Sequence, residues 1–173
     1  KYTNKIDYIF HLGACSKTTE PDRGYVMEVN LKYSKKILNY SANNGIDMVY
    51  ASSASVYGGG STFKEDPAYE SSLNHYSESK LLFDKYVREN FDKINSQIVG
   101  IRYFNVYGPY EQHKGVMSSV IYHFYNQFKN HGMLKLFKGS HGYANGEQRR
   151  DFVYVKDTID IKIWFMNNDA SGI

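Results

Sequence analysis

The sequence predicts an α/β fold in which a doubly wound parallel sheet carries helices on both faces. Short apolar segments of strand length alternate with longer segments in which apolar residues recur at helical spacing. Small residues and glycines follow the apolar segments, as is common where a strand ends and a loop begins. This alternation is typical of βαβ units, which place neighbouring strands parallel in one sheet.

The first half of the chain contains two expected strands and one helix. Residues 6–11 form a short apolar run that ends near Gly13, which predicts a buried strand. Residues 25–41 carry apolar side chains at helical spacing, and Gly45 stands where helices commonly stop. Residues 46–53 form the next apolar run and predict a second strand.

The second half continues the alternation after a loop of turn-forming residues at 58–74. Residues 76–91 predict an amphipathic helix whose apolar residues face one way and whose charged residues face the other. The remaining expected elements are a strand at 97–104, a helix at 117–128, short strands at 135–137 and 152–155, a polar loop at 139–150, and a helix beginning near 156.

Composition narrows the class of protein. The chain has 173 residues, of which 42% are hydrophobic and 23% are charged, as in a globular protein of one domain. A net charge of +3, with no run of five or more Lys or Arg residues, argues against a nucleic-acid partner. The single cysteine, Cys15, gives no sign of an oxidising compartment, and no apolar run has the length of a membrane-spanning helix. We therefore expect a cytoplasmic protein with no membrane partner, and we predict no metal site.

A tyrosine and a lysine one helical turn apart form the first candidate site. Tyr76 and Lys80 lie at positions i and i+4 near the start of an expected helix, so they share one face. A neighbouring ammonium favours the phenolate and lowers the tyrosine pKa from its usual value of about 10, which suits an acid/base group. The spacing alone also fits a stabilising pair on a surface helix.

Two serines supply the context for this pair. Ser52 and Ser53 close the second expected strand, at the carboxyl end where ligands bind to open α/β sheets. A hydroxyl at this place can hydrogen-bond a substrate oxygen or the tyrosine. The alternative is that these small polar residues simply cap the end of the strand.

Together these motifs resemble the extended short-chain dehydrogenases/reductases, the NAD-dependent epimerases and dehydratases. The resemblance rests on Gly13-Ala14, residues 52–58, Tyr76-x-x-x-Lys80 and residues 102–109, which stand in the order found in that family. It implies a Rossmann-like fold that binds NAD or NADP and a nucleotide sugar, and it implies a homo-oligomer. We interpret residues 1–173 as one NAD(P)-binding domain fragment, with 109–151 contributing to the substrate side. The first βαβ unit, with its Gly-rich turn, and the C-terminal part are expected to lie outside it.

Within the family, the chain is similar to the branch that epimerises ADP-heptoses. Dehydratases of the family carry an Asp-Glu pair where Ala54 and Ser55 stand here, which argues against dehydration. The segments that carry the closer resemblance are residues 11–20, 95–100, 113–120, 136–140 and 150–155. A UDP- or dTDP-sugar 4-epimerase of the same family remains an alternative, as does a non-catalytic nucleotide-binding protein.

The resemblance implies an inversion at C6 of ADP-D-glycero-D-manno-heptose, through transient oxidation by bound NADP, for lipopolysaccharide inner-core synthesis. NAD remains possible as the cofactor. The implied catalytic residues are Tyr76 and Lys114 as two acid/base groups, with Ser53 and Lys80 in support. The implied cofactor contacts are Leu12, Gly13, Ala14, Cys15, Ser16, Lys80, Val106 and Lys114. The implied substrate contacts are Asn105, Val116, His123, Phe137, Lys138, Gly139, Ser140 and Arg150.

Two positions and one loop depart from the pattern of that branch. Val29 and Val116 stand where the branch has polar residues, so one cofactor contact and one substrate hydrogen bond differ here. The stretch from Gly142 to Gln148 looks longer than the corresponding loop, which leaves the alignment of Arg150 open, with Arg149 beside it as a competitor.

Overall fold

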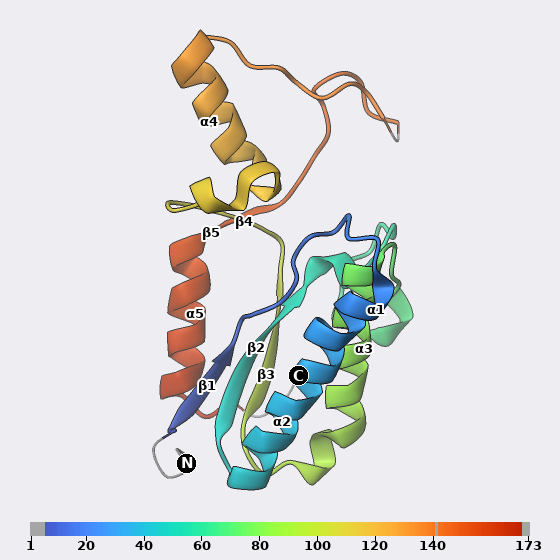
Figure 1. Cartoon of the computed structure of the whole chain (residues 1–173), viewed down its shortest axis with the longest axis vertical. Helices are drawn as coiled ribbons and strands as arrows, with labels where there is room; N and C mark the ends of the chain where they lie inside the picture. The colour runs from blue at the N-terminus through green and yellow to red at the C-terminus, as the bar shows by residue number, and fades with distance from the viewer. Residues whose placement is uncertain (1–5, 141, 171–173) are drawn as a thin grey trace. The chain divides into compact units, whose positions relative to one another are not determined.

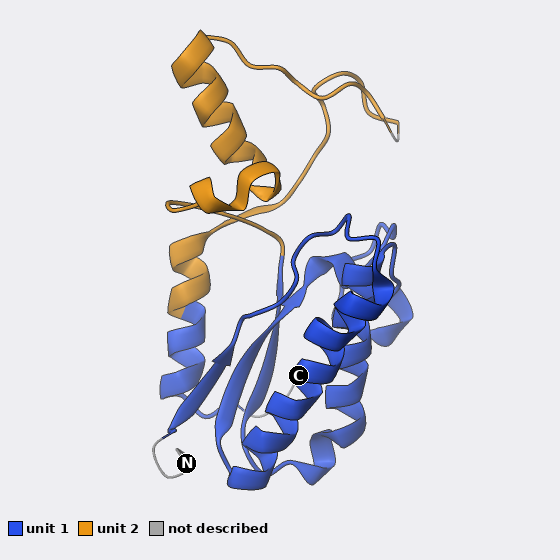
Figure 2. Ribbon diagram, in the orientation of Figure 1, with its two compact units in different colours: residues 1–103, 161–173 blue, residues 104–160 orange. Residues whose placement is uncertain are grey.

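The computed structural model describes residues 6–140 and 142–170 (Figure 1). The chain divides into two compact units (Figure 2). The first unit comprises residues 1–103 and 161–173, and the second comprises residues 104–160.

A three-stranded parallel sheet forms the framework of the first unit. Its strands are β1 (Tyr8–His11), β2 (Asp47–Ser53) and β3 (Ile98–Tyr103), in the order β1-β2-β3. All three coincide, within one or two residues at each end, with strands predicted from apolar runs. The parallel sheet expected from the alternating pattern is therefore confirmed.

Two helices cover one face of this sheet (Figure 1). The first begins as α1 (Arg23–Val26), passes through a π-helical segment (Met27–Lys32) and continues as α2 (Tyr33–Asn44). It ends at Gly45, whose φ of 62° is the left-handed conformation that glycine adopts at little cost. The second helix is α3 (His75–Asn90). Short 3-10 helices lie at Ala54–Val56, Pro67–Tyr69 and Phe91–Lys93.

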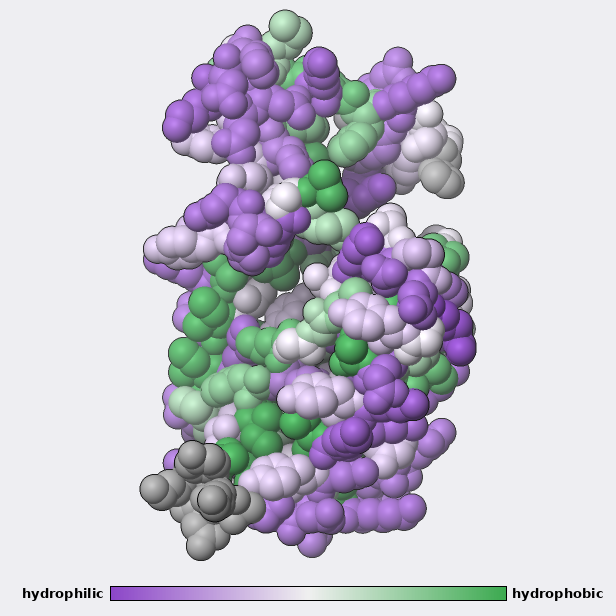
Figure 3. All heavy atoms as spheres, in the orientation of Figure 1, coloured by the Kyte–Doolittle hydropathy of each residue, from purple (hydrophilic) through white to green (hydrophobic). Residues whose placement is uncertain are grey.

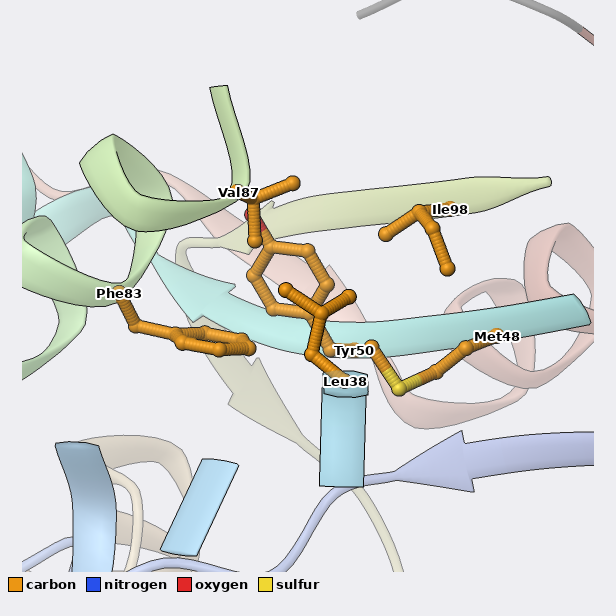
Figure 4. Packing of buried hydrophobic residues seen from close by; sticks show 6 residues of the cluster. All are labelled: Leu38, Met48, Tyr50, Phe83, Val87 and Ile98. Atoms are coloured by element: carbon orange, nitrogen blue, oxygen red, sulfur yellow. The ribbon is translucent and has the colours of Figure 1, made fainter. Parts of the chain in front are cut away.

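The hydrophobic core lies between these helices and the sheet (Figure 4). Tyr50 of β2 and Phe83 of α3 meet edge to face, with their ring centroids 4.8 Å apart. The other buried members of the cluster are Leu38, Met48, Val87 and Ile98.

The opposite face of the sheet meets the last helix, α5 (Val155–Asn167). Successive side chains of a strand point to opposite faces, so Tyr103 lies on the face away from buried Ile98. The Lys162 ammonium of α5 lies 5.7 Å from the centre of the Tyr103 ring. Helices therefore contact both faces of the sheet, as the doubly wound class requires.

The second unit is smaller. A parallel pair joins β4 (Asn105–Tyr107) to β5 (Phe152–Tyr154), and the first half of α5 follows β5 directly. Between the two strands lie a 3-10 segment (Gln112–Met117) and α4 (Val120–His131), which begins three residues later than predicted. The predicted strand at 135–137 is wrong, because these residues form an irregular segment beside the loop that follows.

Apolar side chains remain exposed along α5, and one face of the molecule shows this region as hydrophobic (Figure 3). The exposed large residues on this helix are Ile159, Ile161, Ile163, Trp164 and Met166. Over residues 6–140 and 142–170, no helix combines the length and apolar character needed to cross a membrane.

Candidate functional site

Ser53 is placed by the end of β2. Its backbone is still extended (φ −156°, ψ 143°), and it caps the short 3-10 helix at Ala54–Val56. Its hydroxyl oxygen accepts hydrogen bonds from the Ser55 backbone N–H (3.2 Å) and the Ser55 hydroxyl (2.9 Å). With both of these bonds accepted, the Ser53 proton remains available to a further partner, and that partner is Tyr76.

Tyr76 is the second residue of α3, and a capping box fixes the start of this helix. The Asn74 side chain accepts a hydrogen bond from the Ser77 backbone N–H (2.8 Å), while the Ser77 hydroxyl accepts one from the Asn74 N–H (3.1 Å). Because the helix start is held in this way, the Tyr76 ring is placed beside the end of β2.

The Tyr76 hydroxyl has a raised pKa. Burial of the half-buried ring raises the pKa above its ordinary value, and the hydrogen bond with Ser53 lowers it only in part. This is opposite to the direction expected from the Tyr-x-x-x-Lys spacing. The Lys80 ammonium lies 5.9 Å from the centre of the Tyr76 ring.

Lys80 is buried, with 7% of its surface exposed. Its ammonium donates a hydrogen bond to the Ala51 carbonyl of β2 (2.6 Å). Burial lowers the Lys80 pKa to about 8, although the Asp84 carboxylate opposes that shift. The structure therefore brings Ser53, Tyr76 and Lys80 together at the carboxyl end of β2.

Asp84 is a further buried residue beside Ser53, Tyr76 and Lys80, and its motif context did not mark it as a site residue. It lies one turn after Lys80 and accepts hydrogen bonds from the hydroxyls of Tyr50 (3.0 Å) and Ser52 (2.7 Å) and from Arg102 Nε (3.3 Å). The amphipathic pattern of this helix predicts its charged residues on the outer face, and buried Lys80 and Asp84 contradict that prediction. Their i, i+4 spacing was the signal that both share the inner face.

The loop after β1 carries five of the expected cofactor contacts. Leu12, Gly13 and Ser16 are exposed, whereas Ala14 and Cys15 are half-buried. The Asn30 side chain holds this loop by accepting a hydrogen bond from the Cys15 N–H (2.8 Å) and donating one to the Cys15 carbonyl (3.1 Å).

Asn30 also donates to the Ser79 hydroxyl of α3 (3.0 Å), and Ser79 donates to the Tyr76 carbonyl (2.7 Å). Asn30 itself lies within the π-helical segment, a feature often found at functional sites. One buried amide thus connects the loop after β1 with the helix that carries Tyr76.

A hollow of about 430 Å³ opens beside this loop. It is lined by Gly13, Ala14, Cys15, Tyr25, Glu28, Val29, Tyr33 and Lys36. The Val29 side chain is among the lining groups, so this position offers an apolar surface to the hollow.

Lys114 lies in the second unit, within the 3-10 segment. Its side chain is 40% exposed, and its ammonium lies 3.6 Å from a carboxylate oxygen of Glu111. The next residues favour a turn, since Gly115 has a φ of 55°. Val116 is 92% exposed and makes an apolar contribution to the surface of this segment.

Asn105 and Val106 lie in β4. The Asn105 amide nitrogen donates to the Asp151 carbonyl (2.9 Å), so this side chain holds the approach to β5. Val106 pairs with Val153 across the two strands.

The remaining expected substrate contacts lie on α4 and in the loop that follows. His123 is half-buried on α4, and its ring lies 6.1 Å from that of Tyr122. The Gly139 N–H donates to the Asn145 side chain (2.7 Å), and the Lys138 carbonyl accepts from Gln148 (2.8 Å). Phe137, Lys138, Ser140 and Arg150 are exposed.

Comparison with known proteins identifies the class to which this site belongs. The model of the NAD dependent epimerase/dehydratase family matches residues 1–173, so the chain belongs to that family. Its α/β fold and parallel sheet agree with the Rossmann-like class expected from the motifs.

Particular relatives narrow the similarity to heptose epimerases. Over 169 residues the chain is 52% identical to an ADP-L-glycero-D-manno-heptose-6-epimerase from Alkalilimnicola ehrlichii, covering 97% of this chain and 53% of that relative. The crystal structure of the Helicobacter pylori ADP-L-glycero-D-manno-heptose-6-epimerase matches with a TM-score of 0.83 at 35% identity, over 96% of this chain and 51% of that one.

A UDP-N-acetylglucosamine 4-epimerase from Methanobrevibacter ruminantium matches the fold of this chain almost as well as the Helicobacter pylori enzyme does, but its sequence is less similar to this chain. It matches with a TM-score of 0.82 at 27% identity, over 96% of this chain and 53% of that one. The chain spans about half the length of the curated relatives it matches. The resemblance to the heptose branch that the motifs indicated is confirmed by these similarities.

The residues of the first unit fit a nicotinamide dinucleotide. The clamped loop at 12–16 exposes backbone beside the hollow, and Gly13 has no heavy atom within 4 Å of where a Cβ would stand. A buried ammonium and a phenol lie at the carboxyl end of the sheet, where nucleotides bind in this class of fold.

Proposed function

We propose that the whole protein inverts C6 of ADP-D-glycero-D-manno-heptose to give ADP-L-glycero-D-manno-heptose. The observation that carries this proposal is the 52% identity to a heptose 6-epimerase over nearly the whole chain. We further propose that residues 1–173 act as one NAD(P)-binding domain, with 109–151 on the substrate side.

The cofactor proposed is NADP, with NAD as the alternative. When bound, it would supply reversible hydride transfer at C6. The exposed loop at 12–16 and Lys80 are the groups of the first unit proposed to contact it, and Val106 and Lys114 are those of the second. Val29 would contribute only apolar contact or its backbone.

Tyr76 is proposed to exchange a proton with the C6 oxygen while the hydride moves. Its raised pKa makes it a proton donor at neutral pH, suited to the step in which the ketone becomes an alcohol again. Ser53 would orient the same oxygen, because its hydroxyl already meets Tyr76. Lys80 would hold the cofactor and favour the phenolate whenever Tyr76 takes up the proton.

Inversion requires a second acid/base group near C6, and Lys114 is proposed for it. As a neutral amine, Lys114 would accept the proton of the C6 hydroxyl on oxidation, and Tyr76 would donate a proton on reduction. An ammonium on a 40% exposed side chain can turn towards a bound substrate, and the adjoining Gly115 supports a tight turn. The proposed substrate contacts are Asn105, Val116, His123, Phe137, Lys138, Gly139, Ser140 and Arg150. Arg150 is assigned to the diphosphate, whose charge and geometry suit a guanidinium.

The wider setting follows from this substrate. We propose that the protein works as a homo-oligomer in the cytoplasm, and that its product supplies lipopolysaccharide inner-core synthesis.

The decisive experiment incubates the whole protein with ADP-D-glycero-D-manno-heptose, without added cofactor, and follows the ratio of C6 epimers by anion-exchange chromatography. Conversion to an equilibrium mixture supports the proposal and shows that the protein retains its cofactor. Activity on a UDP-hexose in its place would favour the 4-epimerase alternative, and activity on neither would favour a non-catalytic protein.

Two variants assign the acid/base groups. We expect Tyr76→Phe and Lys114→Met each to lower kcat by at least ~100-fold, the lower end of the usual range for a lost acid/base group. Exposed Lys85→Met on α3 is the matched control and should keep wild-type kcat. A Lys114→Met variant with near wild-type kcat would remove Lys114 from the mechanism and again favour a 4-epimerase.

A further inference from the structure

Glu111 is a buried acidic residue in the segment that carries Lys114. Only 3% of its surface is exposed, although it lies in an irregular connection between β4 and α4. Carboxylates are seldom buried to this degree unless they are paired or hydrogen-bonded. Neither the motif analysis nor the similarity to the heptose epimerases assigns it a role.

The carboxylate of Glu111 joins the two ends of this segment. One oxygen accepts hydrogen bonds from the Gly108 N–H (3.0 Å) and the Ser119 hydroxyl (2.8 Å), and the other accepts one from the Ser119 N–H (2.7 Å). The Glu111 carbonyl accepts two more, from the Lys114 N–H (2.9 Å) and the Ser118 hydroxyl (2.9 Å). The Glu111 side chain thus links Gly108 and Ser119, the two ends of the segment at 108–119.

Tyr110 and Gly115 of this segment have positive φ angles, which the hydrogen bonds of Glu111 help to stabilise. Tyr110 has a φ of 68°, which is uncommon outside glycine, and its side chain is 79% exposed. Packing of the Tyr110 ring therefore does not stabilise the conformation. Gly115, at the other side of Lys114, also has a positive φ of 55°. Uncommon backbone conformations persist where surrounding contacts over-determine them.

The same carboxylate faces the lysine. The Lys114 ammonium lies 3.6 Å from the oxygen that accepts from the Ser119 N–H. Burial raises the Glu111 pKa, but the hydrogen bonds from Ser119 and Gly108 and the charge of Lys114 outweigh burial, so the pKa stays below its ordinary value. Glu111 is therefore ionised at neutral pH and can pair with the ammonium.

We propose that Glu111 is the positioning residue for Lys114: it fixes the segment at 108–119 and holds the ammonium until substrate replaces the pairing. This inference rests on the proposed role of Lys114 in epimerisation. Its structural part, the closure of the segment by one carboxylate, is independent of any substrate.

Glu111→Gln in the whole protein is the informative change, because glutamine keeps the shape but replaces one acceptor oxygen with a donor. Whichever way the amide turns, an NH₂ group then meets a backbone N–H, of either Gly108 or Ser119. The matched control is Glu89→Gln, which alters an exposed carboxylate on α3.

The first readout is hydrogen–deuterium exchange of the peptide 108–119, with no ligand present. We expect exchange at least ~10-fold faster in Glu111→Gln, as a local opening becomes easier, and unchanged in Glu89→Gln. Should Glu111→Gln fail to fold, Ser118→Ala removes only the hydrogen bond to the Glu111 carbonyl and should accelerate exchange in the same peptide. Wild-type exchange in the folded variant overturns the proposal, whether or not the protein is an epimerase.

The second readout is a double-mutant cycle on ADP-heptose turnover. We expect Glu111→Gln to lower kcat by ~10- to 100-fold, the scale of a misplaced catalytic group, with KM nearly unchanged. In the Lys114→Met background, Glu111→Gln should lower kcat little further, because Glu111 acts through the Lys114 ammonium, which that background lacks. Losses that multiply would overturn the positioning role. A wild-type protein inactive on ADP-heptose would instead refute the proposed function, leaving closure of the segment to be decided by exchange.

Discussion

At the scale of single residues, burial determines the chemistry of the candidate site more than the neighbouring charge does. Burial raises the Tyr76 pKa and lowers the Lys80 pKa to about 8, so both groups are moved towards their neutral forms. The motif Tyr-x-x-x-Lys shows that the two residues share a helix face. It does not show that this face is covered by the sheet, because burial depends on residues far away in the sequence.

The lowered Lys80 pKa predicts a pH-dependent contribution to stability. The folded-state value of about 8 lies below the ordinary value of 10.5, so the folded protein binds fewer protons than the unfolded protein between these two pH values. Stability from this group therefore rises with pH across that window, by roughly 3 kcal/mol in total.

Lys80→Met isolates this effect. We expect the free energy of unfolding of the wild type, measured relative to Lys80→Met by urea denaturation, to increase from pH 8 to pH 10.5 and to stay constant from pH 6 to pH 7.5. Loss of the hydrogen bond to the Ala51 carbonyl changes the difference in unfolding free energy between the two proteins by a constant amount. It does not change how that difference varies with pH. A difference that stays constant up to pH 10.5 would show that Lys80 is solvated.

At the scale of secondary structure, α3 is tied to β2 at consecutive positions. Lys80 bonds the Ala51 carbonyl, Asp84 accepts from Ser52, and Tyr76 meets Ser53. The position of Tyr76 therefore depends on where α3 begins as well as on its own contacts.

Asn74→Ala removes the cap that sets this start. We expect the free energy of unfolding to fall by about 1 kcal/mol, the usual cost of losing a helix N-cap, and kcat to fall as the first turn frays. Asn44→Ala is the control, because this exposed amide donates to the Tyr40 carbonyl within its own helix. Its cost should stay within about 0.5 kcal/mol. Equal losses in the two variants would argue that the capping box contributes nothing specific.

Some helices and strands could be predicted from the sequence and others could not. β1, β2, β3 and α3 were predictable because their apolar periodicity matches their burial. The π-helical segment at Met27–Lys32 was not, since the buried contacts of Asn30 with Cys15 and Ser79 come from distant parts of the chain. The strand predicted at 135–137 is absent because its apolar run pairs with no other strand, whereas β4, not predicted, gains its pairing from β5.

The residues of the candidate site that belong to sequence motifs were predictable, whereas the residues that are notable only for their burial were not. Ser53, Tyr76 and Lys80 were named from the sequence, and the structure brings them together. Asp84 and Glu111 were missed, because an acidic residue on a helix or loop ordinarily indicates a solvated surface. Only the folded arrangement shows that each accepts hydrogen bonds from several donors.

At the scale of the whole molecule, residues 1–173 contain the proposed acid/base groups but lack a sequence signature for binding the cofactor phosphates. The 173 residues contain no Gly-x-Gly-x-x-Gly turn, the signature of the diphosphate site in this class of fold. The loop at 12–16 and Lys80 are the groups of the first unit that we propose for cofactor contact.

We therefore expect residues 1–173, produced alone, to show no NADP binding by isothermal titration calorimetry and no turnover of ADP-heptose. The whole protein, measured in the same buffer, is the comparison and should bind. A micromolar dissociation constant for residues 1–173 alone would contradict this and would show that the clamped loop and Lys80 suffice.

The parallel pairing of the described strands has a consequence for how the chain folds. Tyr8 pairs with Asp47, Met48 with Ile98, and Asn105 with Phe152, so each pairing joins residues about 40 to 50 positions apart. No such pair can form until the helix between its strands has been synthesised and compacted. Closing loops of this length before any contact is gained makes folding slow. On the ribosome, β4 would wait with its backbone unpaired for β5 to emerge, which makes this strand a point where a chaperone, or a second nascent chain, can bind.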